Sequence, residues 1–339
     1  MGIVGGFDLH RRQITFDVLD TDSGVVSRGV IRPAIRLELR RWLGQFEGRE
    51  AAFVVEGTTG WRFVVEELRR AGMEAHLAEP AETRALRGPK RRAKTDRADA
   101  RHLRQLLAEG RVPESWIPPA HLADLRTTVR LRKSLVDMQS AWDRRIQAQL
   151  FHHGLPEPPN LNTLAGRLAA EGAKVPAASR QVIAVGFRLR DAIDTELERI
   201  DSQLGDFAQR QRGCRELQRE YGVGPVLAPV ILAELGDTRR FSSARQAVRY
   251  AGLDVTVSDS DGKGPPGQLS RQGSSVLRWA LYEAAGSAWR TGSPDHDYYL
   301  SVKDRLDSRR ARLSVARRML RRISHHLAEL GDPAFAPLR

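Results

Sequence analysis

The feature that most restricts the fold of this 339-residue chain is the pattern of its N-terminal part. Short apolar segments typical of strands alternate there with segments typical of helices. Residues 2–8, 12–20 and 25–31 are rich in β-branched and apolar residues and are separated by turn-forming residues, which predicts a three-strand meander. Two helices and two strands are then predicted in alternation: helix 34–46, strand 51–56, helix 61–71 and strand 74–78. Strands that alternate with helices after a meander indicate an α/β domain with a mixed sheet.

Two long helical patterns follow, over residues 122–150 and 179–211. Their apolar residues recur every three or four positions with charged residues between them, which is close to a heptad rhythm. Prolines interrupt residues 154–178 between the two patterns, so we expect a loop-rich turn there. The whole pattern predicts an antiparallel helical hairpin, which is either an ordinary helical domain or a protruding coiled-coil arm for self-association.

The last part of the chain is mainly helical by pattern, with helices expected at 274–288 and 295–330. Gly222 and Gly224 open another helix without a side-chain cap. The free N–H groups of such a helix are suited to a phosphate, as in helix-hairpin-helix elements, although a plain tight turn explains the glycines equally well. We therefore predict three regions: an α/β domain at 1–118, a helical arm at 119–212 and a mainly α-helical domain at 213–339.

The composition predicts a polyanionic binding partner and no membrane span. The chain has 55 Lys and Arg against 42 Asp and Glu, a formal charge of +13, and arginine provides most of the positive charge. No apolar run reaches the roughly 18 residues that cross a bilayer, and the N-terminus lacks the pattern of a signal peptide. Cys214 is the only cysteine, which excludes a disulfide framework and a cysteine-based zinc site. We expect a soluble cytoplasmic protein that binds nucleic acid and no membrane.

Asp96 and Asp99 form a carboxylate pair at helical spacing inside a very basic stretch. Residues three apart lie on one face of a helix, and two like charges held that close repel unless a cation lies between them. The basic residues around the pair are Arg84, Arg87, Lys90, Arg91, Arg92, Lys94, Arg97, Arg101 and Arg104. A metal-dependent enzyme that acts on a phosphate backbone needs this combination of charges.

Two further carboxylates end predicted strands, namely Asp8 and Glu56. Adjacent strands present their ends at one edge of a sheet, and a helix packed on that sheet can bring an acidic face alongside them. Two divalent cations about 3.5–4 Å apart need several bridging oxygens, so a phosphoryl-transfer site with two metal ions requires such a cluster. Hard oxygen ligands suit Mg²⁺, with Mn²⁺ as an alternative. Each acid alone is more often a turn former or a solvent-facing residue.

Three segments around these acids, at 5–8, 55–60 and 94–100, resemble the DEDD catalytic pattern of the insertion-sequence one-ten family of transposases. The resemblance implies a RuvC-like, that is RNase H-like, fold for the first domain. It continues into a second motif set that is similar to the transposase domain of that family: residues 222–225, 241–253, 269–273 and 277–278. The two sets occur in the expected order, and the resemblance covers nearly the whole chain.

The resemblance implies that Asp8, Glu56, Asp96 and Asp99 bind divalent metal and that a serine in the loop after 250–253 is the nucleophile. The spacing from Leu253 matches Ser260 best, with Ser258 and Ser270 as alternatives because acids crowd this loop and its later part is short. A loop of Ser, Asp and Gly is by itself usually a turn. The implied reaction is DNA cutting and rejoining through a covalent phosphoserine, in an active site composed from both regions.

The family also implies donor and target DNA, a structured non-coding (bridge) RNA that chooses the sites, and assembly of a homo-oligomer, from dimer to tetramer. The protein would then be prokaryotic and associated with the nucleoid when active. Phosphate contacts position a nucleic acid without specifying its sequence. The residues we expect to make such contacts are Arg87, Lys90, Arg91, Arg92, Lys94, Arg97, Gly222, Gly224, Arg271, Arg278, Arg317, Arg318 and Arg321.

Two other functions are compatible with the same residues. The first is a RuvC-like nuclease that hydrolyses branched DNA with water as the attacking group, in which the C-terminal region only binds substrate. The second is a non-catalytic nucleic-acid-binding protein in which the acids are structural. The two alternatives differ from a recombinase in whether Ser260 and Asp96 are needed for strand chemistry.

Overall fold

The computed structural model describes residues 2–87, 95–157, 160–256, 268–270 and 273–337. The chain divides into two compact units, Met1–Ile117 and Pro118–Arg339. The first unit is the predicted α/β domain, and the second is helical apart from one short β-ribbon. The predicted boundary between a helical arm and a C-terminal domain lies inside the second unit and stays a prediction.

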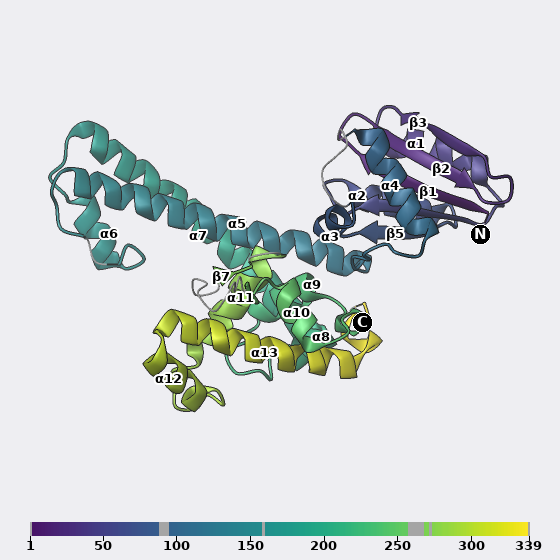
Figure 1. The fold of residues 1–339 in the computed structure, drawn as a ribbon. Coiled ribbons are helices and arrows are strands. Elements are labelled where there is room, and N and C mark those ends of the chain that lie inside the picture. The colour runs from purple at the N-terminus through teal and green to yellow at the C-terminus, as the bar shows by residue number, and fades with distance from the viewer. Residues whose placement is uncertain (1, 88–94, 158–159, 257–267, 271–272, 338–339) are drawn as a thin grey trace, which may run out of the picture. The chain divides into compact units, whose positions relative to one another are not determined.

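The first unit is built on a mixed sheet of five strands in the order β3-β2-β1-β4-β5 (Figure 1). The strands are β1 (Ile3–Leu9), β2 (Ile14–Asp20), β3 (Val26–Ile31), β4 (Ala51–Glu56) and β5 (Glu74–Ala78). The first three strands pair antiparallel, whereas β1, β4 and β5 run parallel to one another. The three-strand meander and the mixed sheet are therefore confirmed.

Strand side chains alternate between the two faces of this sheet, and different helices cover each face. On one face, the rings of Phe7 (β1) and Phe53 (β4) stack with their centroids 5.0 Å apart. These rings share one core with α1 (Arg36–Leu43) and α2 (Trp61–Arg70). The opposite face of the sheet is covered by the helix α4 (Asp96–Ala108). Two short elements complete the unit, the 3-10 helix η1 (Gly44–Phe46) and the helix α3 (Pro80–Ala85).

The contact of α4 with the sheet is very close at Gly6. A Cβ atom at Gly6 would lie 2.3 Å from the carbonyl oxygen of Ala100 and 2.5 Å from the amide nitrogen of Arg104. Leu103 and Leu107 of α4 pack on Val4 and other small residues of the same sheet face. Glycine at this strand position therefore allows the helix backbone to rest directly on β1.

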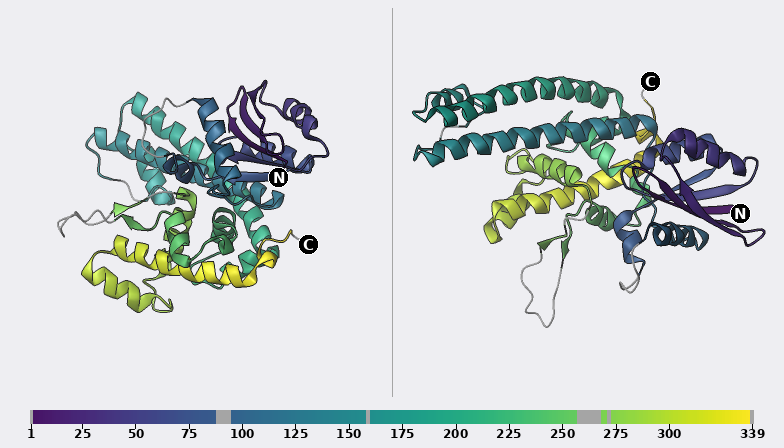
Figure 2. Two further views of the ribbon diagram at one scale, coloured as in Figure 1. Left: turned by 45° about the vertical axis from the view of Figure 1, so that its right-hand side comes forward. Right: turned by 90° about the horizontal axis from the view of Figure 1, so that it is seen from above.

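The second unit begins with two long helices, α5 (Ala120–His152) and α7 (Ala177–Arg210), which lie side by side in both views of Figure 2. Arg132 donates two hydrogen bonds to Asp201, at 2.5 and 2.9 Å, and Gly186 allows a close approach to Ile146. The segment between them, predicted as a loop-rich turn, also contains the short helix α6 (Leu164–Glu171). Thr163 caps α6 with its side chain, a local signal that outweighs the prolines around it.

The remaining helices surround α9 (Leu227–Leu235), whose residues from Ala228 onward are buried. The other elements of this part are α8 (Arg212–Leu217), η2 (Thr238–Arg240), α10 (Ala244–Tyr250), β6 (Val255–Thr256), β7 (Gln268–Leu269), α11 (Ser275–Ala284), η3 (Ala285–Ser287), α12 (His296–Arg305), α13 (Ser308–Leu330) and η4 (Asp332–Ala334). The predicted helix 295–330 is in fact two helices, because Asp307 accepts a hydrogen bond from the Arg310 amide and so starts a new helix.

Among the described residues, every helix is too short or too polar to serve as a membrane span.

Candidate active site and nucleic-acid surface

Asp8 and Glu56 lie at the ends of neighbouring parallel strands, on the face of the sheet that α4 covers. On β1, Val4 and Gly6 face α4, and the alternation of side chains puts Asp8 on the same side. On β4, Ala52 and Val54 belong to the core under α4, which puts Glu56 on that side as well. Parallel pairing of β1 with β4 brings both acids to one edge of the sheet.

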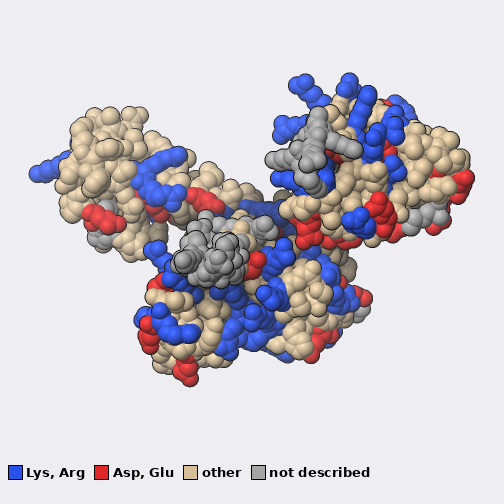
Figure 3. Space-filling view, in the orientation of Figure 1, with Lys and Arg blue, Asp and Glu red and all other residues tan. Residues whose placement is uncertain are grey.

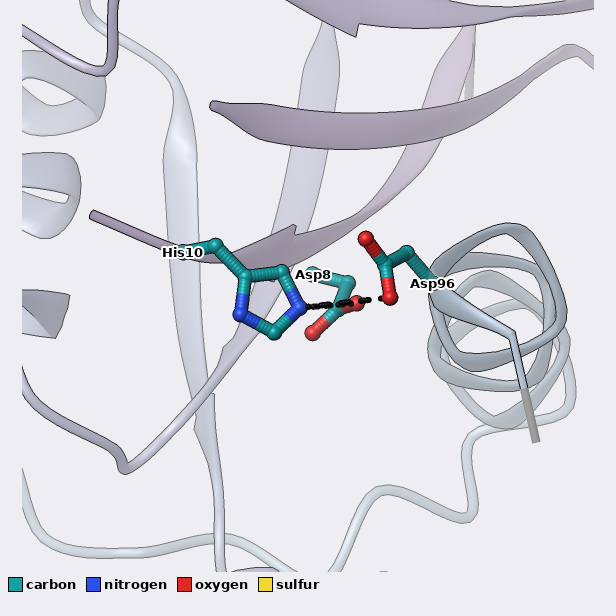
Figure 4. Close-up of side chains that lie close together, drawn as sticks. All are labelled: Asp8, His10 and Asp96. Carbon is teal, nitrogen blue, oxygen red and sulfur yellow. Dashed lines mark hydrogen bonds and ion pairs between the residues drawn. The ribbon is translucent and has the colours of Figure 1, made fainter. Parts of the chain in front are cut away.

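The first turn of α4 adds its acids to this edge. Asp8, His10 and Asp96 each present one potential ligand atom, and these atoms lie within 4.8 Å of one another (Figure 4). The Nε2 atom of His10 lies 3.2 Å from Oδ2 of Asp8 and 3.4 Å from Oδ1 of Asp96. Thr95 caps α4 through its side chain, so the helix starts where Asp96 can reach β1. We refer to Asp8, Glu56, Asp96 and Asp99 as the acidic cluster.

Electrostatics couple all four carboxylates of the acidic cluster. Burial raises the pKa of Asp8, and the charges of Asp99 and Asp96 raise it further, against the opposing effect of His10. Burial likewise raises the pKa of Glu56, with Arg87 opposing and with Asp8 and Asp99 adding to the shift. Arg87 donates a hydrogen bond from Nη1 to Oδ1 of Asp99. Negative charge is therefore costly at Asp8 and Glu56, the two half-buried acids of the cluster.

The donor set fits a hard divalent cation. Carboxylate oxygens are the ligands that Mg²⁺ and Mn²⁺ prefer, and the raised pKa values of Asp8 and Glu56 mark charge that a cation would relieve. The catalytic and metal-binding roles of the four acids stay predictions.

His10 is the residue at this site that reasoning from sequence missed, together with Gln13. Gln13 donates from Nε2 to Oδ2 of Asp96 at 3.2 Å and so holds that carboxylate from the β1–β2 turn. A signal was present in the chain, because His10 follows Asp8 by two residues and extended residues two apart share a face.

The basic stretch before α4 is only partly described. Lys90, Arg91, Arg92 and Lys94 lie outside the described residues. Arg97 is exposed on the first turn of α4, which is compatible with a phosphate contact. Arg104 is different: its side chain is nearly buried and is paired with Asp17 at 2.5 Å, so it belongs to the interior of the domain. The role of Arg97 stays a prediction.

Lys and Arg side chains also gather on the C-terminal helices (Figure 3). Two of the arginines that we expected to contact nucleic acid bind backbone carbonyl groups there. Arg278 donates to the Ala251 oxygen at 3.0 Å, and Arg317 donates to the Leu253 oxygen at 2.6 Å. Both side chains therefore hold the segment that leads into β6.

The arginines of α13 fall into two groups. Arg318 contacts Asp295 at 3.4 Å and stacks over Tyr298, and Arg322 pairs with Asp295 and with Glu220. Arg321 is exposed and makes no ion pair with any residue that the structure describes. An arginine without an internal partner is the better candidate for a phosphate contact, because binding then breaks no pair.

The two glycines before α9 differ in what their surroundings require. Gly222 has a φ of 92°, and a Cβ atom there would lie 2.3 Å from the Ala284 oxygen and 2.3 Å from Oγ of Ser287. Close packing against η3 thus explains this glycine. Gly224 has open space around it, and α9 begins without a side-chain cap. Phosphate binding at this turn stays a prediction.

The predicted nucleophile Ser260 and its alternative Ser258 lie outside the described residues, as does Arg271. The short strands β6 and β7 pair antiparallel on either side of that loop. Ser270 directly follows β7 and donates its hydroxyl hydrogen bond to the carboxylate of Asp254.

Two protein-family models match the chain. A model labelled as a DEDD transposase of the IS110 group and described as "Transposase" matches residues 5–153. A model described as "Transposase IS116/IS110/IS902 family" matches residues 214–300. The first match contains all four acids of the acidic cluster, and the second contains the β6–β7 ribbon.

Individual relatives are also named as transposases. The chain is 23% identical over 296 residues to a "Probable family 20 transposase" of Pseudomonas aeruginosa, a match that covers 84% of this chain and 83% of the relative. It is 29% identical to a protein of Sinorhizobium fredii named as the transposase y4rJ, over 70% of this chain and 65% of the relative. It is 24% identical to the "Transposase for insertion sequence element IS1111A" of Coxiella burnetii, over 58% of this chain and 55% of the relative.

Proposed function

Because the chain belongs to the IS116/IS110/IS902 family of transposases, we propose that it cuts and rejoins DNA strands at a metal-assisted site formed by the acidic cluster. The observation that carries this proposal is the convergence of Asp8, His10 and Asp96, whose ligand atoms lie within 4.8 Å of one another. Mg²⁺ is the proposed cofactor, with Mn²⁺ as a substitute, because the donors are mainly carboxylate oxygens.

The residues of the acidic cluster would hold the cation, with His10 and Gln13 orienting the carboxylates of Asp8 and Asp96. A bound divalent cation would neutralise the non-bridging phosphate oxygens and lower the pKa of an attacking hydroxyl. His10 reaches both Asp8 and Asp96 and so bridges these two carboxylates. Burial of Asp8 and Glu56 strengthens these charge interactions, because water screens them less.

The proposed nucleophile is Ser260, which the similarity to the family favours. Its oxygen attacks the phosphorus of a DNA phosphodiester, one phosphorus–oxygen bond to the sugar breaks, and the leaving sugar oxygen takes up a proton. A sugar hydroxyl of the second DNA partner then attacks the phosphoserine and regenerates the serine, so bond energy is conserved without ATP. Ser258 and Ser270 are the alternatives, and Ser270 is favoured between them because its hydroxyl donates to the Asp254 carboxylate, a contact that can activate a serine.

We further propose that a structured non-coding RNA selects donor and target DNA by base pairing and that the protein acts as a homo-oligomer of two to four copies. The formal charge of +13 supports contacts with long phosphate backbones. Exposed arginines such as Arg97 and Arg321 are the proposed contacts, since neither makes an ion pair with a described residue. Phosphate contacts carry no sequence information, which leaves recognition of the sites to the RNA.

The test of strand chemistry compares Asp96→Asn with Glu109→Gln. Asp96 is the first residue of α4, whereas Glu109 directly follows the other end of that helix and pairs with Arg111. We expect Asp96→Asn to abolish Mg²⁺-dependent cleavage and joining of element-end DNA, with Glu109→Gln unchanged. Equal activity of the two variants would show that the acidic cluster is structural, and the absence of Mg²⁺-dependent strand chemistry in the wild type would show that the protein only binds nucleic acid.

The test of the nucleophile is a covalent protein–DNA adduct trapped in denaturant. Ser260→Ala should remove the adduct and all joined product, while Ser270→Ala should keep both. The reverse result would assign the reaction to Ser270. Cleavage that persists in both variants without any adduct would identify a hydrolytic nuclease.

A further inference from the structure

Asp17 of β2 is a buried carboxylate that is not part of the acidic cluster but lies on the same face of the sheet. Its side chain is only 2% exposed. Asp17 pairs in register with Gly6 of β1, two residues before Asp8. Because side chains alternate along a strand, Asp17, Gly6 and Asp8 all face α4.

Arginines from two elements surround this carboxylate. Arg104 of α4 donates from Nε to Oδ1 of Asp17 at 2.5 Å, and Nε of Arg101, one turn earlier, lies 3.7 Å from Oδ2. Arg28 of β3 donates to Oδ2 at 2.8 Å. A charge buried to this degree is costly unless paired, so Asp17 holds α4 to the sheet by strong, directional bonds.

This attachment lies close to the acidic cluster along a rigid helix. Arg104 follows Asp96 by eight residues, which is about 12 Å along an α-helix. The backbone of α4 rests on Gly6 between these two points, with the Ala100 oxygen 2.3 Å from a Cβ that glycine lacks. With the Arg104 side chain attached to Asp17 and the backbone from Ala100 to Arg104 resting on Gly6, the helix is held where its first turn reaches Asp8.

We propose that Asp17 is a positioning residue for the metal site: it holds α4 through Arg104 so that Asp96 and Asp99 meet Asp8 and Glu56. This inference rests on the proposed function of the acidic cluster. Asp17 itself binds no metal. Its removal loosens the far end of α4 and lets the first turn move away from β1.

A matched control exists on the opposite face of the same sheet. Glu67 of α2 has a side-chain exposure of 0% and pairs with Arg36 at 3.0 Å and Arg40 at 2.9 Å. It is a buried carboxylate held by arginines, as Asp17 is, but its nearest partners belong to α1 and a third, Arg70 at 3.8 Å, belongs to α2 itself. Asp17→Asn and Glu67→Gln therefore remove comparable buried ion pairs, and only the first one involves α4.

The experiment measures Mn²⁺ binding by the full-length protein with calorimetry, and amide hydrogen exchange in residues 96–108 without metal. We expect Asp17→Asn to weaken Mn²⁺ binding about 10- to 100-fold, the usual effect of losing a residue that orients metal ligands. It should also speed exchange in α4 more than in the other helices. Glu67→Gln should leave the Mn²⁺ affinity and the exchange of α4 unchanged. Arg104→Lys, which keeps the charge beside Asp17, should give a smaller loss.

The outcomes separate this inference from the function it rests on. If wild-type protein binds Mn²⁺ and both variants bind it equally well, Asp17 has no positioning role. If Asp17→Asn and Glu67→Gln weaken binding and speed exchange alike, the effect is one of general stability and the inference is wrong. Wild-type protein that binds no Mn²⁺ contradicts the metal site itself. If Asp17→Asn does not fold, the same comparison between Arg104→Lys and Glu67→Gln decides.

Discussion

Arg87 donates a hydrogen bond to Asp99 and is at the same time the main charge that opposes the raised pKa of Glu56. One guanidinium group thus partly neutralises two carboxylates that we assign to metal binding. In the absence of a cation, this arginine takes over part of the cation's role.

Arg87→Ala should therefore tighten Mn²⁺ binding by the DNA-free protein, because the arginine competes with the metal for the same carboxylates. A contribution of about 1 kcal/mol, as for a partly exposed pair, corresponds to a factor of about five in affinity. Calorimetry with Arg111→Ala as the control measures this, since Arg111 pairs with Glu109 beyond the end of α4. Weaker binding by Arg87→Ala would show that the arginine orients Asp99 and does not compete.

Asp8→Asn should make the metal-free protein more stable while it abolishes activity. Burial raises the pKa of Asp8, so its charged form costs folding free energy at neutral pH. Replacing a strained functional residue of this kind commonly stabilises a protein by about 0.5–2 kcal/mol. Chemical unfolding in the presence of a chelator measures the gain, with Glu109→Gln as the control.

The pH dependence of that gain follows from the direction of the shift. The pKa of Asp8 is higher in the folded than in the unfolded state, so the folded protein takes up its proton first as the pH falls. The advantage of Asp8→Asn is therefore complete above the raised pKa and shrinks as the pH falls toward the ordinary carboxyl value of about 3.9. An advantage that grew on acidification would contradict a raised pKa.

Gly6→Ala should displace α4. The new Cβ would lie 2.3 and 2.5 Å from backbone atoms of Ala100 and Arg104, and backbone atoms cannot move aside cheaply. Overpacking of this kind costs about 1–3 kcal/mol. Loss of Mn²⁺ binding together with lower stability is the expected result. Gly44→Ala is the control, since nothing lies within 4 Å of a Cβ there.

Arg321 and Arg322 are neighbours on α13 that should behave differently. Arg321→Ala should lower DNA affinity and reduce the slope of log affinity against log salt by about one, with stability unchanged. Arg322→Ala should destabilise the fold by about 2 kcal/mol or more, because it leaves Asp295 and Glu220 nearly buried without this partner. DNA-binding titrations at several salt concentrations and chemical unfolding make the comparison. Equal salt slopes for Arg321→Ala and wild type would remove Arg321 from the binding surface.

Local sequence signals predicted the sheet and the long helices well. The alternation of residues in β1 and β4 and the apolar spacing of α5 and α7 are properties of the chain itself. Helix boundaries were predicted less well. The single helix predicted over residues 295–330 is interrupted, because Asp307 caps the start of α13 after α12 has ended, and Thr163 caps the short helix α6 inside the predicted loop-rich turn.

The candidate site was only partly predictable from the sequence, because folding decides which charged residues pair with one another. The acids at strand ends and the Asp96–Asp99 spacing are visible in the sequence, as is a basic surround. Which arginines are available for phosphate is not, because Arg104 is as basic in the sequence as Arg97 and becomes a buried partner of Asp17 only after folding. His10 likewise needed the position of α4 before it could be recognised.

The sequence by itself determined that Asp8 and Glu56 each end a strand, and which residues of that strand share a face with each acid, since side-chain direction alternates along a strand. The pairing of the two strands, which brings both acids to one edge, is a tertiary contact. Only the tertiary structure decided that α4 covers the face with these acids and brings Asp96 to them. Helix placement depends on contacts between distant residues, here the glycine at position 6 and the Asp17–Arg104 pair, and no local pattern encodes which distant partners will meet.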